Sequence, residues 1–135
     1  MAFWLVKSEP GTYSWENLSQ DKITVWDGIR NAEARNNLKK MIQDDLVLFY
    51  HTGSEKSIVG CAQVAGEAFP ETNEPAWFAV KLKPLKKLKR SIPLELVKSD
   101  AKLKNMSLVR FGRLSVQPVS KQEFDYILKL SETKP

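Results

Sequence analysis

Short apolar runs, each bounded by a turn signal, follow one another along the whole sequence. Several runs are rich in β-branched and aromatic residues, which favour strands. The pattern predicts an α+β domain in which five or six short strands form a curved, mostly antiparallel sheet or small barrel, with helices packed on its outside and ends. The expected strands cover residues 2–7, 23–26, 46–51, 58–69, 77–83 and 114–119, and the third and fourth are expected to form a hairpin.

Helix starts are signalled by residues whose side chains cap the first free N–H groups of a helix. Ser14 is expected to begin a helix over residues 15–18, and Asn31 a helix that reaches about residue 41. Ser120 and Glu123 form a complete capping box for a C-terminal helix. Pro93 suits the first turn of a further short helix.

The length of 135 residues fits one domain, expected to span residues 1–131 and to end in a frayed tail at 132–135. No apolar run approaches the ~20 residues of a membrane span, and the first residues lack a signal-peptide pattern. A single cysteine excludes an internal disulfide. We therefore expect a monomer without a membrane partner, in the reducing cytoplasm or, if the source is eukaryotic, the nucleus.

Positive charge is concentrated in one segment of the chain. Residues 1–77 hold seven Lys/Arg against eleven Asp/Glu, whereas residues 78–113 hold eleven against two. Such asymmetry indicates a polyanion or phosphate partner, or else a solvated, lysine-rich edge. Pro84 is expected to interrupt the strand at 77–83, and the stretch LKKLKR follows it. The candidate backbone contacts in the basic segment are Lys81, Lys83, Lys86, Lys87, Lys89 and Arg90.

Residues that support covalent or acid–base chemistry are few and unpaired. The sequence has no Gly-rich phosphate loop and no nucleophile elbow. Cys61 lies in an apolar strand, where a thiol is expected to be buried and inert, and His51 is expected to be a structural hydrogen-bonding residue. One histidine and one cysteine make a metal site implausible. We therefore expect a protein that is not an enzyme and holds no cofactor or metal.

The stretch WDGIRNAEARNN at residues 26–37 combines a tryptophan, a turn, an arginine and an asparagine at a helix start. A flat aromatic ring can stack on a base, amide groups can read the base edge, and arginine can contact phosphate. Trp26, Asn31 and Arg30 fit these three roles. The alternative is that Trp26 is a core residue and Asn31 only caps the helix. If Trp26 stacks on a base, replacing it with alanine should abolish base preference and leave the fold intact.

Five stretches together resemble the EVE domain family. They are FWLVKSEP at 3–10, WDGIRNAEARNNL at 26–38, DLVLFYHT at 45–52, IVGCAQV at 58–64 and LVRFGRLSVQPVS at 108–120. The resemblance implies a PUA-like fold, a small twisted barrel with surrounding helices, related to YTH readers and ASCH domains. It also implies recognition of a modified base, with modified cytosine proposed for bacterial members, flipped into a pocket with aromatic walls.

The resemblance supplies candidate site residues from three motifs. We expect Trp26 to stack, Ser8 and Asn31 to read the base edge, and Lys7, Arg35 and Arg113 to face phosphate or sugar. Three features depart from the family pattern: Ala32 replaces a usual tyrosine, Phe111 replaces a usual glutamine, and the loop between residues 69 and 77 is short. Phe111 either offers a substitute aromatic surface or only fills the space. The complete base-pocket set is Trp4, Ser8, Trp26, Asn31, Phe111 and Ser115; the complete backbone-binding set is Lys7, Arg30, Arg35, Lys86, Lys87, Lys89, Arg90 and Arg113.

Four functions remain open from the sequence. The leading one is a non-enzymatic module that recognises a modified base in DNA or RNA. A second is a sensor of a small molecule or modified nucleoside that uses the same pocket. A third, an enzyme acting on nucleic acid, lacks a paired base and nucleophile. The fourth is an interaction subunit of a nuclease or a modification enzyme, which the loss of tyrosine at residue 32 keeps open.

Overall fold

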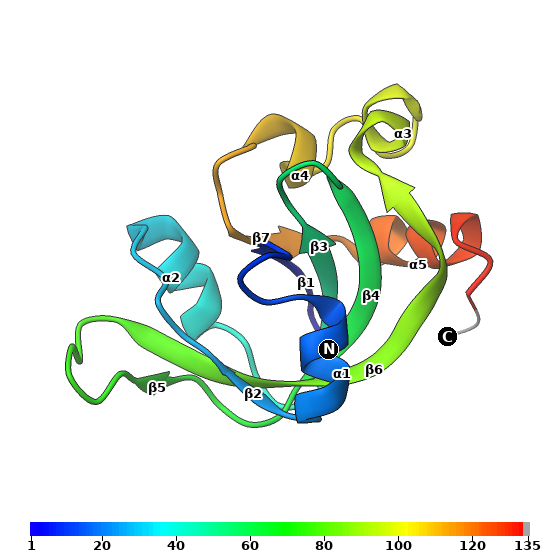
Figure 1. Ribbon diagram of the computed structural model, residues 1–135. Coiled ribbons are helices and arrows are strands. Elements are labelled where there is room, and N and C mark those ends of the chain that lie inside the picture. The colour runs from blue at the N-terminus through cyan, green and yellow to red at the C-terminus, as the bar shows by residue number, and fades with distance from the viewer. Residues whose placement is uncertain (134–135) are drawn as a thin grey trace.

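The computed structural model describes residues 1–133, and a seven-stranded sheet organises them (Figure 1). The strands follow the order β2-β6-β4-β3-β1-β7, and β5 pairs with β6. β1 and β3 are parallel and the other pairs are antiparallel, including the predicted β3–β4 hairpin. The strands are β1 (Phe3–Ser8), β2 (Thr24–Trp26), β3 (Leu46–His51), β4 (Ser57–Val64), β5 (Phe69–Pro70), β6 (Phe78–Pro93) and β7 (Val116–Val119).

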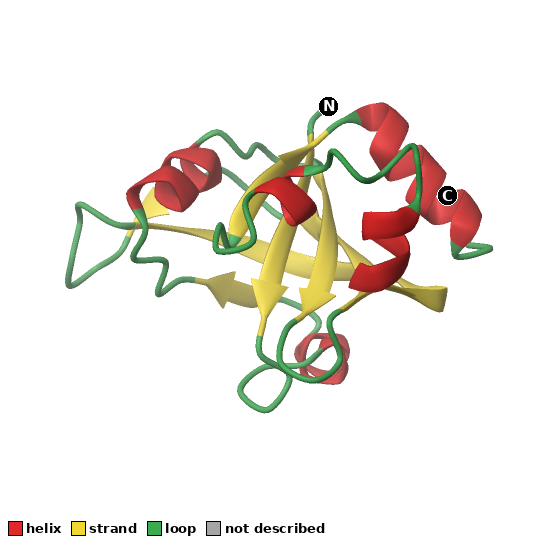
Figure 2. Ribbon diagram, turned by 90° about the horizontal axis from the view of Figure 1, so that it is seen from above, coloured by secondary structure: helices red, strands yellow, loops and turns green. Residues whose placement is uncertain are grey.

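The sheet curls into a half-barrel with the helices around it (Figure 2). This confirms the predicted architecture, although no pairing between β2 and β7 closes the barrel within residues 1–133. No helix in this part of the chain is long and apolar enough to cross a membrane. The helices are α1 (Trp15–Asp21), α2 (Ala32–Lys39), α3 (Leu94–Ser99), α4 (Ser107–Arg110) and α5 (Lys121–Leu130).

The predicted helix caps are confirmed at three positions. The Ser14 hydroxyl and the Asn31 side chain accept from backbone N–H groups three residues later, and Ser120 and Glu123 form the expected box. α2 ends two residues before the expected end at residue 41. α4 was not predicted because Met106, at its N-cap position, gives no side-chain cap.

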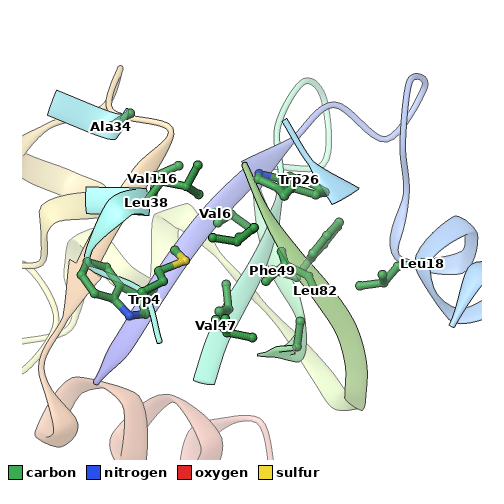
Figure 3. Packing of buried hydrophobic residues seen from close by; sticks show 14 of the residues in the cluster. Trp4, Val6, Leu18, Trp26, Ala34, Leu38, Val47, Phe49, Leu82 and Val116 are labelled. Carbon is green, nitrogen blue, oxygen red and sulfur yellow. The ribbon is translucent and has the colours of Figure 1, made fainter. Parts of the chain in front are cut away.

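Two hydrophobic cores lie on opposite faces of the sheet, because neighbouring residues of a strand point to opposite sides. In β1, Trp4 and Val6 belong to the first core and Leu5 to the second. Figure 3 shows the first core, with Trp4 and Trp26 well apart and Val6 between them. The two tryptophans therefore do not face each other across a shared pocket.

β6 is the main departure from the strand prediction. The strand continues through Pro84 to Pro93 instead of ending near residue 83. Pro84 lies beside the register shift at Cys61/Ala62, where a missing backbone N–H is tolerated. The expected strand at 58–69 is shorter, because β4 ends at Val64 and the chain forms the separate two-residue β5.

Residues 132 and 133 are held against β6 and not frayed. Thr133 is buried, and its hydroxyl accepts from the backbone N–H of Lys89 at 2.9 Å. Glu132 pairs with Arg90 at 2.7 Å. Two of the four residues expected to fray are thus docked on β6, and residues 134–135 lie outside the described part of the chain.

Candidate nucleic-acid interface

The turn between β2 and α2 is held by one carboxylate from the β5–β6 connection. Glu71 accepts two hydrogen bonds from the Arg30 guanidinium, at 2.8 and 2.9 Å, and a third from the backbone N–H of Gly28 at 3.1 Å. Glu74 adds an ion pair to Arg30 at 3.3 Å. Gly28 has φ +76°, a conformation that glycine adopts at low cost. This contact fixes how the chain enters α2.

Trp77 is in cation–π distance of both arginines of this segment. The guanidinium carbons of Arg30 and Arg35 lie 5.2 and 5.1 Å from its ring centroid. Arg35 also donates to the carbonyl of Ala76 at 3.3 Å. Both arginines predicted to face phosphate are therefore engaged by the protein itself.

The contact between Arg30 and Glu71 predicts that the pKa of Glu71 lies below its ordinary value. Hydrogen bonding from Arg30 lowers the pKa of Glu71, so the pair stabilises the folded state above the unfolded-state pKa of about 4.3 and this contribution is lost as pH falls through the lower native pKa. The Gly28 amide resonance should report a midpoint below about 4.3 in an NMR pH titration. Arg30→Gln should bring the midpoint back towards that value, and a wild-type midpoint at or above it would contradict the assignment.

The loop between α4 and β7, residues 111–115, is held by hydrogen bonds from two side chains, the half-buried Lys7 and the buried Gln117. The Lys7 ammonium donates to the carbonyl of Gly112, and its backbone N–H donates to Ser115 at 3.0 Å. Burial lowers the pKa of this lysine. Gln117 is fully buried, and its Nε2 donates to the carbonyls of Leu114 at 2.8 Å and Phe111 at 3.1 Å. These hydrogen bonds hold the loop in one conformation.

Replacing Gln117 with methionine is expected to lower the free energy of unfolding by about 1–3 kcal/mol, since the loop carbonyls lose their donor. The substitution also removes the Gln117 Oε1, which is buried without a partner within residues 1–133. Because removing an unsatisfied acceptor is favourable, it offsets part of the loss. Urea unfolding measures the change, and amide shifts of residues 111–115 report the loop. Gln63→Met is the matched control, because within residues 1–133 the Gln63 side chain makes a single hydrogen bond, of 3.5 Å. Equal stability of both variants would refute the role.

A hollow of about 330 Å³ lies between the first turn of α2 and the 111–115 loop. Further along, α2 is joined to the start of β7 where Asn37 Nδ2 donates to the carbonyl of Val116 at 2.8 Å. We call the hollow of about 330 Å³ the α2 hollow. Its lining residues are Asn31, Glu33, Phe111, Gly112, Arg113 and Leu114. It brings together Asn31, Phe111 and Arg113 from the predicted set, and Phe111 is 49% exposed.

The remaining predicted pocket residues do not line this hollow. Trp4 is 6% exposed, and its Nε1 donates to Asp45 at 3.0 Å, so it is a core residue. Trp26 is 9% exposed and packs edge-on against Tyr13 and Phe49, which favours the core alternative. Ser8 is buried, and its hydroxyl donates to a backbone carbonyl. Ser115 is half-buried, and its backbone carbonyl accepts a hydrogen bond from the N–H of Lys7.

The basic residues of β6 do not form one continuous face. Leu82 belongs to the first core and Leu88 to the second, so the exposed side chains between them change sides of the sheet. Lys87 pairs with Glu16 at 3.4 Å, and Arg90 pairs with Glu132. The side chains of Lys86 and Lys89 are exposed, and Lys86 and Lys87 line a shallow groove beside α1.

The potentially reactive side chains outside the α2 hollow, Cys61 and His51, have structural roles. Burial raises the pKa of the Cys61 thiol to about 12, so little reactive thiolate forms near neutral pH. His51 is buried, accepts from the backbone N–H of Trp15 at 3.0 Å and contacts Glu55 at 3.2 Å. Within residues 1–133, no group of three or more His, Cys, Asp or Glu side chains is arranged to hold a metal ion.

The EVE domain family model matches residues 2–130. This chain belongs to the EVE domain family. Thymocyte nuclear protein 1 from Mus musculus is 36% identical in an alignment 169 positions long, which covers 98% of this chain and 75% of that protein. The crystal structure of human THYN1 in complex with 5-methylcytosine-containing DNA has a TM-score of 0.89 and 34% identity, and covers 100% of both chains.

The family assignment agrees with the architecture of the half-barrel. An ASCH domain from Zymomonas mobilis, 15% identical over 96% of this chain and 95% of its own, has a TM-score of 0.61 and shows the shared fold alone. This EVE domain therefore has the PUA-like fold that the resemblance of its sequence motifs implies.

Three side chains in or around the α2 hollow were not predicted as site residues. Glu71 and Gln117 act through contacts with Arg30 and with loop carbonyls, which only the folded chain brings together. Glu33 lies in the first turn of α2, and the sequence carries no signal for the loop that faces it across the hollow.

Proposed function

We propose that this EVE domain binds nucleic acid that carries a modified cytosine, and that it holds the flipped base in the α2 hollow without doing chemistry on it. The observation that carries the proposal is the match to human THYN1, which was solved with DNA containing 5-methylcytosine and aligns over the whole of both chains. The α2 hollow supplies a place on this chain where such a base fits.

The size and lining of the α2 hollow support one flat ligand group. Its volume of about 330 Å³ is at the low end of the range of about 300–1,000 Å³ for small-molecule sites. The exposed Phe111 ring provides a stacking surface, and stacking contributes about 1–3 kcal/mol per base. Flipping a base costs a few kcal/mol, so hydrogen bonds to the base edge must add to stacking.

Cations around the hollow support contact with the nucleic-acid backbone. Arg113 lines the hollow and makes no ion pair within residues 1–133. Arg110 lies over the Phe111 ring at 5.4 Å. Arg30 and Arg35 would have to exchange their present contacts for phosphate. We therefore assign the phosphate role first to Arg113, and a supporting role to Lys7 beneath the loop.

Trp26 and Ser8 are proposed to support the hollow from the core. Trp26 shares the first core with Ala34 and Leu114, which flank the two walls of the hollow. Ser8 fixes the end of β1, next to Lys7. In this arrangement Phe111 takes the stacking role that the sequence assigned to Trp26.

The test is fluorescence anisotropy with two single-stranded oligonucleotides that differ in one 5-methylcytosine. We expect tighter binding of the methylated strand, and loss of that preference in Phe111→Ala. Leu85→Ala, at an equally exposed apolar side chain on β6, is the control and should keep the preference. Arg113→Gln should weaken both strands alike and reduce the salt slope by about 1. Equal affinity of wild type for both strands would refute the proposal.

A second candidate is a sensor of a free modified nucleoside. The observation that favours it is the division of the β6 cations between two sides of the sheet, which leaves no continuous basic track for a polymer. Calorimetry with 5-methyl-2′-deoxycytidine separates the two functions. Affinity equal to that for the methylated strand favours the sensor, and affinity at least about tenfold weaker favours the nucleic-acid module, because phosphate contacts then contribute.

A further inference from the structure

Glu33 is an unpaired carboxylate in the lining of the α2 hollow. It lies in the first turn of α2, two residues after Asn31, and is exposed. It makes no hydrogen bond or ion pair within residues 1–133, in contrast to Glu71 and Glu123. A bare carboxylate repels phosphate, so its place in this hollow suits a hydrogen-bond donor of the ligand rather than the backbone.

The proposed function creates a selection problem that shape cannot solve. Thymine carries the same C5-methyl group as 5-methylcytosine on a ring of the same size, so methyl contacts and stacking on Phe111 treat the two bases alike. The bases differ at position 4, where cytosine has an N4 amino donor and thymine an O4 acceptor. A reader of methylated cytosine therefore needs a hydrogen-bond acceptor that faces position 4.

The lining of the α2 hollow includes both an acceptor and a donor. The Asn31 Oδ1 is occupied by the N–H of Ala34 at 2.9 Å, which leaves the Nδ2 amide as the free donor of that side chain. Glu33 is acceptor-only when ionised. A cytosine edge presents the N4 donor next to the N3 acceptor, which matches this pair, whereas thymine presents O4 and N3–H, which oppose it.

We propose that Glu33 is the specificity-determining residue of the α2 hollow, accepting a hydrogen bond from the N4 amino group of cytosine and rejecting thymine and uracil. This inference rests on the proposed function. Asn31 donates to N3 or O2 of the same base while its other amide atom caps α2. The charge of Glu33 is placed where a base edge, not a phosphate, has to approach.

The test compares single strands with one central 5-methylcytosine or one thymine, so that base pairing does not weigh on the flipping step. Wild type should prefer 5-methylcytosine by at least about tenfold, within the range for a specific base contact. Glu33→Gln should reduce the ratio to about twofold or less, because a carboxamide can turn its N–H towards O4. Glu95→Gln, a first-turn glutamate of α3 that is also exposed, removes the same charge and should keep the ratio.

The outcomes separate this inference from the function it rests on. A wild-type preference for 5-methylcytosine that Glu33→Gln leaves unchanged overturns the role of Glu33 and keeps the proposed function. The same holds if wild type prefers methylated over plain cytosine but binds the thymine strand equally well. Equal binding of methylated and plain cytosine overturns the proposed function, while the cytosine-to-thymine ratio still measures whether Glu33 reads position 4.

Discussion

Replacing Trp26 with alanine is expected to lower the free energy of unfolding by about 3–5 kcal/mol. The indole is 9% exposed, and its ring centroid lies 5.5 Å from that of Phe49 and 6.0 Å from that of Tyr13. Removing it leaves a cavity in the first core, which the surrounding sheet cannot fully close. Urea unfolding followed by circular dichroism measures the loss. The expectation that this variant keeps the fold intact is therefore replaced by one of strong destabilisation.

Trp26→Phe is the matched control, because it keeps an aromatic ring against Phe49 and should cost less than half as much. For binding experiments Trp26→Leu is the better variant, because leucine fills the core without an aromatic face. If Trp26→Leu retains base preference, Trp26 acts through the core, whereas loss of preference with an intact fold would return the stacking role to Trp26. A cost below about 1 kcal/mol for Trp26→Ala would show that the ring is not a packed core residue.

Replacing Asp45 with asparagine is expected to lower the free energy of unfolding by about 2–4 kcal/mol, from about 1–3 kcal/mol for each buried group left unsatisfied. The carboxylate is 1% exposed. One oxygen accepts from the N–H of Ala2 at 3.0 Å, and the other accepts from Trp4 Nε1 at 3.0 Å and from the N–H of Ile42 at 3.1 Å. An asparagine has an NH₂ group in place of one carboxylate oxygen, so on that side a donor faces a donor and the hydrogen bond is lost. Thermal or urea unfolding gives the measurement.

Asp44→Asn supplies the control for Asp45. The two aspartates are adjacent and undergo the same chemical change, but the Asp44 side chain is exposed and makes no hydrogen bond or ion pair within residues 1–133. Its φ of +76° is one that asparagine tolerates well. Similar unfolding free energies for the two variants would contradict the structural role given to Asp45 and the core position of Trp4.

Local signals predicted the elements well, and non-local contacts decided the rest. The Ser120 box and the Asn31 cap are short-range hydrogen bonds, so the sequence carries them in full. Pro84 signals a strand end, yet the register shift in β4 removes the need for its N–H and the strand continues. The position of Trp4 in the core depends on Asp45, which is 41 residues away.

The candidate site follows the same division. The motifs located Asn31, Phe111 and Arg113, and the structure brings them to one hollow. It withdraws Trp4 and Trp26 into the core, because aromatic residues at strand positions bury their large apolar surface there. It also shows Arg30 and Arg35 engaged with Glu71 and Trp77, a pairing that depends on how the short β5–β6 connection folds back on α2.

The central claim, that a modified cytosine occupies the α2 hollow, is tested most directly by NMR. Wild-type protein labelled with ¹⁵N is titrated separately with two strands that differ in one 5-methyl group. We predict tighter binding of the methylated strand, with the largest shift differences between the two titrations at the amides of residues 31–34 and 111–115. Superimposable titrations, or differences confined to β6 and α1, would contradict the account.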